Sequence, residues 1–278
     1  MSTINGSIVL YHNKKKQLLK AIKSFFDTEL DVKLYLVDNS GDDTLKSLAE
    51  IDERVEYIYN NANLGYGAAH NIAMRKSIAD GVPYHLVLNP DIYFDNGVIE
   101  RLYEYMHVNN DIGHIMPKVL YPDGELQYLC KQIPSPIDLI FRRFLPFKDW
   151  KQRRNNFYEL RFTNYDCVMN VPYLSGCFMF LRTSALEKVG LFDERFFMYP
   201  EDIDLTRRIH DQYKTIFYPK VSIIHEHEKA SFKSFKMMKI HMWNMIKYFN
   251  KWGWILDMDR IKKNKKLLQE LREQGKLK

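Results

Sequence analysis

The sequence predicts an α/β protein in which helices flank a mostly parallel central sheet. Three observations predict this fold class. Short β-rich runs alternate with amphipathic stretches in the first part of the chain, acidic side chains follow two of the predicted strands, and 46% of the 278 residues are hydrophobic. The length fits one large domain or two small ones, and the apolar content is enough for a substantial core and excludes an intrinsically disordered chain.

The first part of the chain has a regular order of strands and helices. Strands are predicted at residues 7–11, 33–37, 55–59 and 84–88, and helices at residues 14–26, 44–51, 67–78 and 97–108. This alternation favours parallel strands joined by helical crossovers. Ligands of such sheets bind outside the carboxyl ends of the strands. Asp38 and Asp91, which each follow a predicted strand, are therefore candidate binding residues.

The second part of the chain is less regular. Residues 121–171 contain four prolines and a run of basic residues, and we interpret them as an irregular excursion from the sheet. Beyond them, strands are predicted at 173–181, 215–218 and 221–224, and helices at 183–189, with Thr183 as N-cap, and at 201–211. Residues from 231 onward have helical patterns. We therefore divide the chain into a domain of residues 1–230 and a basic, amphipathic helical tail of residues 231–278.

The positive charge of the chain is concentrated in this tail. The net charge is +6, yet residues 229–278 alone hold 14 Lys and Arg against 4 Asp and Glu, interleaved with Trp, Phe and Met. Two interpretations are open: a solvated helical face, or a contact with the anionic headgroups of a membrane surface. Nucleic acid is not expected as a partner, because no recognised binding module accompanies the charge.

The cysteines and the N-terminal residues indicate the cellular compartment in which the protein is expected. Cys130, Cys167 and Cys177 form no CxxC pair, which favours reduced thiols in a cytosolic protein. The N-terminal residues show neither the basic nor the apolar region of a signal peptide, and no apolar run approaches the roughly 20 residues of a membrane span. We expect a cytoplasmic protein, with peripheral attachment to the inner face of the cell membrane as an option.

Two segments rich in Asn, Asp and Gly follow predicted strands. Asp38 opens the turn Asp-Asn-Ser-Gly-Asp-Asp, which is either an ordinary turn or one that offers a carboxylate to a nucleobase. Residues 60–71 are rich in Gly, Ala and Asn and open a helix. They are either a capped helix start or a place where the backbone closely approaches an anionic ligand. They match neither the GxGxxG nor the Walker A pattern.

Two acidic motifs and a histidine pair contain the candidate metal ligands and the candidate general base. Asn89-Pro90-Asp91 is either a plain turn or a site where one carboxylate holds a divalent cation together with substrate phosphate oxygens. Glu201-Asp202-Ile203-Asp204 begins a helix, where the helix dipole favours acids in any case, and Asp202 is also a candidate general base. Because side chains alternate along a strand, at most one of His225 and His227 faces this site.

Taken together, these motifs resemble glycosyltransferase family 2, and most closely its bacterial rhamnosyltransferase-like branch. They occur in the family's order across about residues 7–231. The residues that carry the resemblance are 37–40, 63–71, 88–91, 174–179, 190–194, 197–199 and 201–205, with His225. Two features depart from the family pattern: Asn89 stands in place of the first Asp of its DxD motif, and residues 226–229 replace a more Gly- and Ser-rich segment.

The resemblance implies a GT-A fold and an inverting transfer of a sugar from a nucleoside diphosphate to a hydroxyl group. Asp202 is then the catalytic base, and Asp91 and His225 hold Mg²⁺ or Mn²⁺. The implied contacts to the nucleotide-sugar are Tyr11, Asp38, Asn63, Gly65, Asn71, Asn89, Ser175, Gly176 and Glu201. The branch suggests rhamnose from dTDP-rhamnose, with UDP-sugars also open, and the expected acceptor is a growing, lipid-linked cell-surface glycan.

Two other functions are open at this point. A sugar-phosphate nucleotidyltransferase would also use a metal and carboxylates, although residues 11–14 lack the Gly-rich loop that it needs after its first strand. A non-catalytic membrane-surface binding protein with a degenerate GT-A fold is the other alternative. The presence of both Asp91 and Asp202 argues against such degeneracy.

Overall fold

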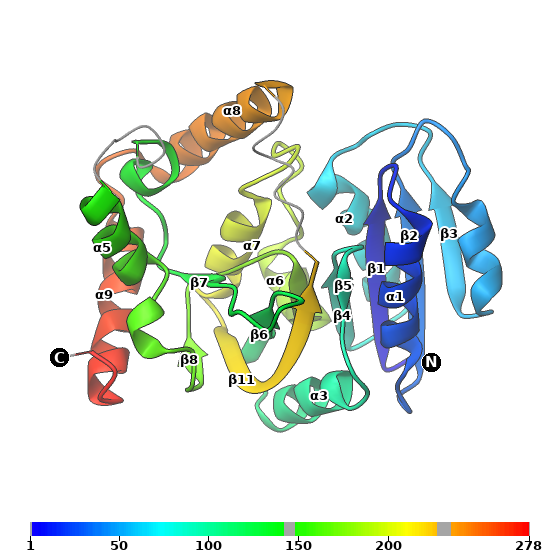
Figure 1. Ribbon diagram of the computed structural model, residues 1–278, viewed down its shortest axis with the longest axis horizontal. Coiled ribbons are helices and arrows are strands. Elements are labelled where there is room, and N and C mark those ends of the chain that lie inside the picture. Colours follow the sequence, from blue (N-terminus) through cyan, green and yellow to red (C-terminus); the bar gives the residue numbers. More distant parts are fainter. Residues whose placement is uncertain (1, 142–147, 227–234, 278) are drawn as a thin grey trace.

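The structure, a computed structural model, describes residues 2–141, 148–226 and 235–277. A nine-stranded mixed sheet runs through the described chain, with helices on both of its faces (Figure 1). The strands lie in the order β3-β2-β1-β4-β10-β6-β11-β5, and β8 pairs with β11. The predicted α/β class, a mostly parallel central sheet flanked by helices, is confirmed.

Four parallel strands form the first half of the sheet. They are β1 (Ile4–Leu10), β2 (Val32–Asp38), β3 (Val55–Tyr59) and β4 (Tyr84–Leu88). All four overlap the predicted strands. β3 and β4 agree with the prediction at both ends, β2 is longer by one residue at each end, and β1 begins at Ile4 and not at residue 7. Because the strands are parallel, their carboxyl ends meet at one edge of the sheet, where ligands of such folds bind.

The second half of the sheet is mixed. β10 (Phe178–Arg182) runs antiparallel between β4 and β6 (Ile112–Leu120), and β6 pairs in parallel with β11 (Lys214–His225). β11 also carries the short antiparallel strands β5 (Ile92–Tyr93) and β8 (Met169–Asn170). β7 (Cys130–Lys131) and β9 (Tyr173–Leu174) form a separate two-stranded sheet.

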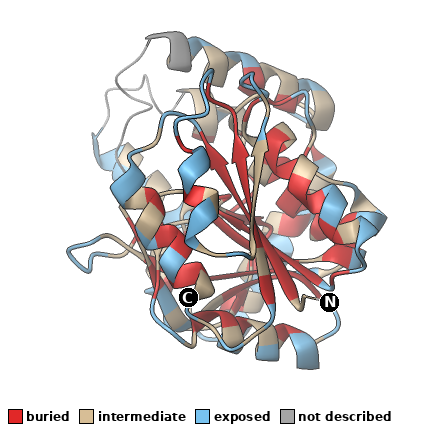
Figure 2. Cartoon of the chain, turned by 90° about the vertical axis from the view of Figure 1, so that its right-hand side faces the viewer, coloured by how far each residue is buried: buried red, intermediate tan, exposed pale blue. Residues whose placement is uncertain are grey.

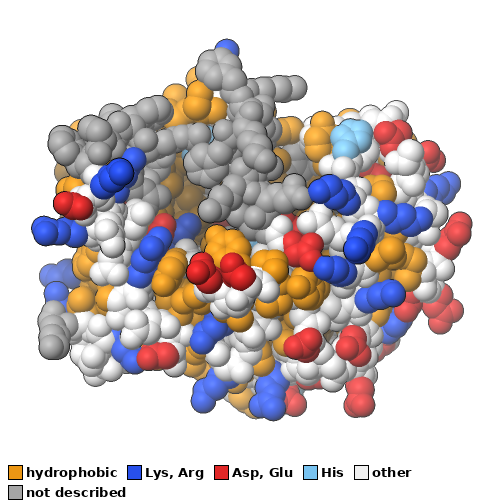
Figure 3. Space-filling model, viewed as in Figure 1, with side chains coloured by type: hydrophobic (Ala, Val, Ile, Leu, Met, Phe, Trp, Pro, Cys, Tyr) orange, Lys and Arg blue, Asp and Glu red, His pale blue; other side chains and the backbone are white. Residues whose placement is uncertain are grey.

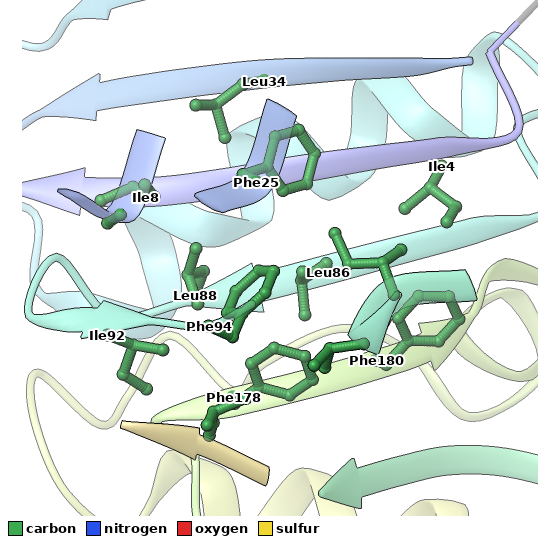
Figure 4. Packing of buried hydrophobic residues seen from close by; sticks show 14 of the residues in the cluster. Ile4, Ile8, Phe25, Leu34, Leu86, Leu88, Ile92, Phe94, Phe178 and Phe180 are labelled. Atoms are coloured by element: carbon green, nitrogen blue, oxygen red, sulfur yellow. The ribbon is translucent and has the colours of Figure 1, made fainter. Parts of the chain in front are cut away.

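Helices bury both faces of the sheet. α1 (Lys15–Phe26) and α3 (Val98–Val108) cover one face, where Phe25, Leu86 and Phe178 belong to the largest apolar cluster (Figure 4). α2 (Tyr66–Ala79), α6 (Thr183–Val189) and α7 (Glu201–Ile209) cover the other. Figure 2 shows the buried strands between these helical layers. At roughly 25 cal/mol per Å² of apolar surface, this burial is the main stabilisation of the fold.

The remaining elements are helical. η1 (Lys46–Ile51) lies between β2 and β3. The middle excursion contains η2 (Ile137–Phe141), α5 (Lys148–Tyr158) and η3 (Arg161–Thr163), and the tail contains α8 (Phe235–Trp252) and α9 (Met258–Glu273). In the part of the chain that the structure describes, no helix has the length and apolarity that a membrane crossing requires. The predicted domain boundary near residue 230 lies outside the described residues.

Several predicted strands differ from the structure. Residues 112–120 form β6, which was not predicted because Gly113 and Pro117 disfavour a strand. The predicted strand at 173–181 is interrupted at residues 175–177, where a turn separates β9 from β10. The predicted strands at 215–218 and 221–224 are parts of β11, whose register shifts between Tyr218 and Ser222.

Details of three helices also differ from the prediction. Only residues 46–51 of the predicted helix at 44–51 are helical, and they form a 3₁₀ helix. α7 ends at Ile209, before the predicted end at residue 211. Thr183 is not the N-cap of α6, because Arg182 holds that position. The Thr183 hydroxyl instead donates to the carbonyl oxygen of Val82 at 2.7 Å, so it has a partner outside the helix.

The apolar faces of the tail helices pack into the body of the protein. Met245 and Phe249 of α8 belong to one apolar cluster with Phe196 and Ile203, which lie before and within α7. On α9, Leu267 packs in a second cluster with residues of β6 and β11. The apolar side chains of the tail are thus partly buried in the core and partly exposed at the surface.

A buried ion pair also joins the tail to α7. The guanidinium of Arg207, on α7, is fully buried and lies 2.5 Å from Asp257 and 2.7 Å from Asp259. Its carbon atom Cζ is 3.9 Å from the ring centroid of Trp252. Four charged or aromatic groups from segments about fifty residues apart therefore meet in one place.

Asp257→Ala is expected to lower the free energy of unfolding by about 3 kcal/mol. It leaves a buried guanidinium with the partly exposed Asp259 and a long contact to the Tyr248 hydroxyl, and it removes the N-cap of α9. Urea unfolding followed by circular dichroism measures the change. Asp111→Ala is the control, since it removes an exposed pair with Lys214 and should cost less than about 1 kcal/mol. Equal losses in the two variants would contradict the role given to the buried pair.

Candidate active site

The predicted site residues gather where the parallel strands end and α7 begins. Asp38 is the last residue of β2, Asn89 and Asp91 follow β4, and Asp202 lies in the first turn of α7. The backbone amide of Asn89 donates to the carbonyl oxygen of Cys177 at 2.9 Å, which joins the end of β4 to the turn before β10. The acidic motifs, far apart in the sequence, are thus neighbours in the fold.

Asp38 is fully buried at the end of β2. Its carboxylate accepts hydrogen bonds from the amide of Ser40 at 2.8 Å and from the hydroxyl of Tyr57 at 2.6 Å. Burial, and then this bond to Asp38, raise the pKa of Tyr57, so the phenol stays a donor. A carboxylate has about four lone-pair sites, so Asp38 keeps acceptor capacity. Its contact with a nucleobase stays a prediction.

A set of asparagines holds the loop after β3 against the end of β2. Asn39 Nδ2 donates to the Gly65 carbonyl oxygen at 3.1 Å, and Asn60 Nδ2 donates to Asn39 Oδ1 at 2.9 Å. The amide of Gly65 donates to Asn63 Oδ1 at 3.0 Å. Gly65 has φ +90°, and a Cβ there would lie 2.4 Å from the carbonyl oxygen of Phe197. Glycine is therefore required at this position.

Asn71 is buried on α2 and its amide group is engaged inside the protein. Nδ2 donates to the Phe192 carbonyl oxygen and to Glu194 Oε1, both at 2.9 Å. Oδ1 accepts from the amide of Phe192 at 3.0 Å. In this structure Asn71 ties α2 to the segment before α7, and its contact with a nucleotide-sugar stays a prediction.

Tyr66 links the strand end to the turn that holds Asp202. Its hydroxyl lies 2.9 Å from Asn89 Oδ1 and 2.8 Å from the carbonyl oxygen of Gly176. Burial raises the pKa of Tyr66 well above its usual value, so the hydroxyl remains neutral. The amide of Gly176 donates to Asp202 Oδ2 at 2.9 Å. A Cβ on Gly176 would lie 2.9 Å from Cβ of Asp202, so the turn approaches α7 as closely as glycine allows.

Two acids lie side by side in the first turn of α7. Asp202 also accepts from the amide of Ile203 at 2.8 Å, and burial raises the pKa of Asp202 above that of an ordinary Asp. Burial, and then the charge of Asp202, raise the pKa of Glu201 well above its usual value. Among the described residues Glu201 Oε2 has no hydrogen-bond partner. The raised pKa makes Asp202 a stronger base, suited to take a proton from a hydroxyl group.

Asp91 and His225 lie close together, because β5 pairs with the end of β11. His225 Nε2 is 3.3 Å from Asp91 Oδ1. This oxygen is buried and has no donor in hydrogen-bonding geometry within the described ranges. Adjacent ligands of an octahedral Mg²⁺, each about 2.1 Å from the ion, lie about 3.0 Å apart. The two side chains therefore fit neighbouring positions around one cation.

Gln127 orients the imidazole of His225. Its Nε2 donates to the His225 carbonyl oxygen at 2.9 Å, which places Oε1 3.0 Å from His225 Nδ1. A proton on Nδ1 satisfies Oε1 and leaves Nε2 as the metal-binding atom. No group of three or more His, Cys, Asp or Glu side chains forms a metal site among the described residues. An ion here needs further oxygens from a diphosphate and water, and metal binding stays a prediction.

Tyr11 and Ser175 complete the predicted set. Tyr11 follows β1 and is exposed, and its amide donates to Asn13 Oδ1 at 2.7 Å. Ser175 lies in the turn between β9 and β10, beside Gly176. His227 lies outside the described residues.

Sequence reasoning gave no role to three residues that shape the site. Tyr66 lies within a recognised motif, and its large polar ring beside two glycines was a usable signal. Tyr57 and Gln127 offered none, because Tyr57 looks like any aromatic residue of a strand and Gln127 lies in the irregular middle. Their roles depend on contacts with Asp38 and His225, which only the folded chain creates.

Comparison with known proteins agrees with this geometry. The family model described as "Glycosyl transferase family 2" matches residues 7–190, well over half of the chain. The chain belongs to glycosyl transferase family 2. It is therefore an enzyme of the glycosyltransferase class, which favours this function over the two alternatives left open by the sequence.

Two relatives belong to the rhamnosyltransferase-like branch. An N-acetylglucosaminyl-diphospho-decaprenol L-rhamnosyltransferase of Mycobacterium tuberculosis is 32% identical over 216 residues, which cover 71% of this chain and 67% of the relative. Rhamnosyltransferase WbbL of Escherichia coli is 26% identical over 251 residues, and the match covers 87% of this chain and 90% of that relative. The predicted resemblance to this branch is confirmed.

Solved structures show the same fold. The structure of GalNAc-T7 with UDP, GalNAc and Mn²⁺ superposes with a TM-score of 0.59 at 14% identity. The match covers 81% of this chain and 43% of that one, so this chain corresponds to less than half of that protein. At this identity the likeness concerns the fold alone, and with the family match it confirms the predicted GT-A fold.

Gly176→Ala is expected to lower the turnover number at least about tenfold, because the added Cβ displaces the carboxylate of Asp202 from its position. Steady-state kinetics with saturating donor measures the change. Gly81→Ala is the control, because Gly81, beyond the end of α2, has no atom within 4 Å of an added Cβ, and its positive φ of +66° makes the substitution strained without any steric contact. That variant should lose about 1 kcal/mol of stability and keep its turnover number. Unchanged turnover in Gly176→Ala would contradict the close fit around Asp202.

Proposed function

We propose that this protein is an inverting glycosyltransferase that moves a sugar, with rhamnose the leading candidate, from a nucleoside diphosphate to a hydroxyl group of a growing, lipid-linked cell-surface glycan. The observation that carries the proposal is the position of Asp202. Its carboxylate is held by the amide of Gly176, in the turn that Tyr66 joins to the end of β4. A base with a raised pKa thus lies beside the strand end that leads to Asp91.

The mechanism follows from where charge develops. As the acceptor oxygen bonds to the anomeric carbon, Asp202 takes the proton of the acceptor hydroxyl, and the bond from that carbon to the diphosphate oxygen breaks. Attack from the face opposite the leaving group inverts the configuration. The products are the glycoside, the nucleoside diphosphate and a protonated Asp202, which returns its proton to solvent. General-base help of this kind typically contributes ~10²–10⁴-fold.

The leaving group requires its own stabilisation. Asp91 and His225 would hold the divalent cation, Mg²⁺ or Mn²⁺, because they fit neighbouring positions around one ion. When bound, such an ion stabilises the negative charge of the departing diphosphate. Asp38 would accept hydrogen bonds from the nucleobase at the end of β2, with Asn63, Gly65 and Tyr11 around it.

The names of relatives support the donor and the acceptor. The mycobacterial relative is named for L-rhamnose transfer to a decaprenol-linked diphospho-sugar, and the Escherichia coli relative is also named a rhamnosyltransferase. We therefore place dTDP-sugars ahead of UDP-sugars as donors, and a polyprenol-linked glycan as acceptor. A lipid-linked acceptor lies at a membrane, so we place the enzyme in the cytoplasm, peripheral to the inner face of the cell membrane.

A thermal-shift panel tests the donor class. UDP, dTDP, GDP and CMP are each added with Mn²⁺, with Mg²⁺ or with a chelator. One nucleoside diphosphate at about 100 times its Kd is expected to stabilise the protein by ~2.7 kcal/mol, and only with metal. No shift with any nucleotide would contradict the proposed donor.

The stereochemistry of the transfer is a separate question. The anomeric proton signal of the product distinguishes inversion from retention.

Asp91→Ala is expected to lose the metal-dependent part of this shift, because it removes a carboxylate ligand. Titration calorimetry of the nucleotide with and without Mn²⁺ measures the loss. Asp95→Ala is the control, because Asp95 is an exposed acid shortly after β5. An unchanged metal dependence in Asp91→Ala would place the cation elsewhere.

A further inference from the structure

Large apolar side chains are exposed where α8 leads into α9. Ile255 is 82% exposed, Leu256 83% and Met258 69%, and Trp254 and Ile261 are also exposed. We call these five residues the apolar tip. Figure 1 shows α8 along the top of the view and α9 at the left, with the connection between them. The tip spans this connection and the first residues of α9, where Met258 and Ile261 lie. So much exposed apolar surface within residues 254–261 indicates a partner, because soluble surfaces rarely gather it in one place.

Positive charge borders the apolar tip on α9. Lys262 and Lys265 are exposed, and their spacing of four and seven residues from Met258 places them on the same side of the helix. The two acids of the turn, Asp257 and Asp259, are paired with the buried guanidinium of Arg207. The free charge around the tip is therefore positive, which is complementary to an anionic surface.

One face of α8 carries a further exposed aromatic side chain. Trp243 is 60% exposed, and Lys247, four residues later on the same side of the helix, donates from Nζ to the carbonyl oxygen of Arg195 at 2.7 Å. At the end of this face Trp254 Nε1 donates to Asn250 Oδ1 at 2.8 Å. The indole ring is thus held at the junction between the α8 face and the tip.

Much of the remaining tail charge is used inside the fold. Lys251 pairs with Asp193 at 2.8 Å and with Asp204 at 2.6 Å. Lys263 pairs with Asp211 and with Asp259. The basic composition of the tail therefore overstates its free charge, and the surface available to a partner narrows to the tip and the lysines beside it.

We propose that the apolar tip inserts into the surface of an anionic lipid bilayer, with Lys262 and Lys265 at the headgroups. Exposed aliphatic and indole side chains with a basic border suit the boundary between headgroups and acyl chains. The inference rests on the proposed function, because the lipid-linked acceptor of that reaction is presented at such a surface.

The tip is joined directly to the catalytic helix. Asp257 lies between Leu256 and Met258 and pairs with Arg207 of α7. Nearby, Trp252 Nε1 donates to Asp204 Oδ1 at 2.8 Å, two residues after the proposed base. Insertion of the tip therefore sets the position of α7, and of Asp202 with it, relative to the lipid surface from which the acceptor hydroxyl arrives.

Flotation of the full chain with lipid vesicles tests the apolar part. The vesicles are phosphatidylcholine alone, or phosphatidylcholine mixed with phosphatidylglycerol. The protein should float with the mixed vesicles, and the double variant Ile255→Asp with Leu256→Asp should lower the partition coefficient about tenfold or more. Val108→Asp is the matched control, because Val108 is 74% exposed at the end of α3 and should leave binding unchanged. Melting temperatures confirm that each variant is folded.

A second pair of variants tests the charge. Figure 3 shows Lys and Arg side chains gathered over α1, a second basic surface on the side of the molecule in view. Lys262→Glu with Lys265→Glu should weaken binding to the mixed vesicles about tenfold or more. Lys16→Glu with Lys23→Glu makes the same charge change at exposed positions of α1 and should have no such effect.

Three results would overturn the inference: flotation of the Ile255→Asp, Leu256→Asp variant like wild type, equal losses in the two charge variants, or a wild-type protein that stays in solution with both vesicles. The last result would instead favour a protein partner for the tip. The measurement uses neither donor nor acceptor. Its failure therefore leaves the proposed transfer reaction standing, and the nucleotide panel tests that reaction without lipid.

Discussion

The buried ion pair between Arg207 and Asp257 is the interaction on which the position of the catalytic helix depends. α7 is short, and its first turn supplies Asp202 while Arg207 lies near its other end. A fully buried guanidinium without its carboxylate would be strongly destabilising, so the tail must dock for α7 to be stable where it is. Lys251 and the indole of Trp252 add bonds to Asp204 on the same helix. The tail is therefore part of the architecture of the site.

The first turn of α7 combines features that oppose stability. Glu201 is buried beside Asp202, one of its oxygens has no hydrogen-bond partner among the described residues, and burial raises the pKa of both acids. Such perturbed acids gather at functional sites, because the chemistry needs a base that ordinary exposure would weaken. The contacts of Tyr66 and the Gly176 amide hold this turn against the sheet. The stabilising contacts of the core and the tail thus offset the free-energy cost of burying Glu201 beside Asp202 at the site.

The sequence predicted the parts of the fold that local patterns determine. β1 to β4 follow from β-rich runs between amphipathic helices, and the rule on strand ends placed Asp38 and Asp91 at the correct edge. β6 escaped prediction because Gly113 and Pro117 hide a strand that pairing with β10 and β11 stabilises. Local propensity is weak evidence wherever such tertiary pairing decides.

Motifs in the sequence predicted the acids of the candidate site together with Gly176 and His225, but not the side chains that orient them. The hydrogen bond between Gln127 and His225 joins residues 98 positions apart, and no local sequence pattern predicts it. The same holds for the tail, whose composition indicated a charged surface although Lys251, Lys263 and the acids at 257 and 259 are used in internal pairs. Long-range ion pairs decide which charges remain free, and these depend on the complete fold.

The most direct test of this account compares wild type with Asp202→Asn for two quantities, the Kd of the nucleotide donor and the turnover number. Asn is close to Asp in size but cannot take the proton of the acceptor hydroxyl. The account predicts that donor affinity stays close to wild type while the turnover number falls by ~10²–10⁴-fold. Turnover within a few-fold of wild type in a folded, donor-binding variant would contradict the assignment of Asp202 as the catalytic base.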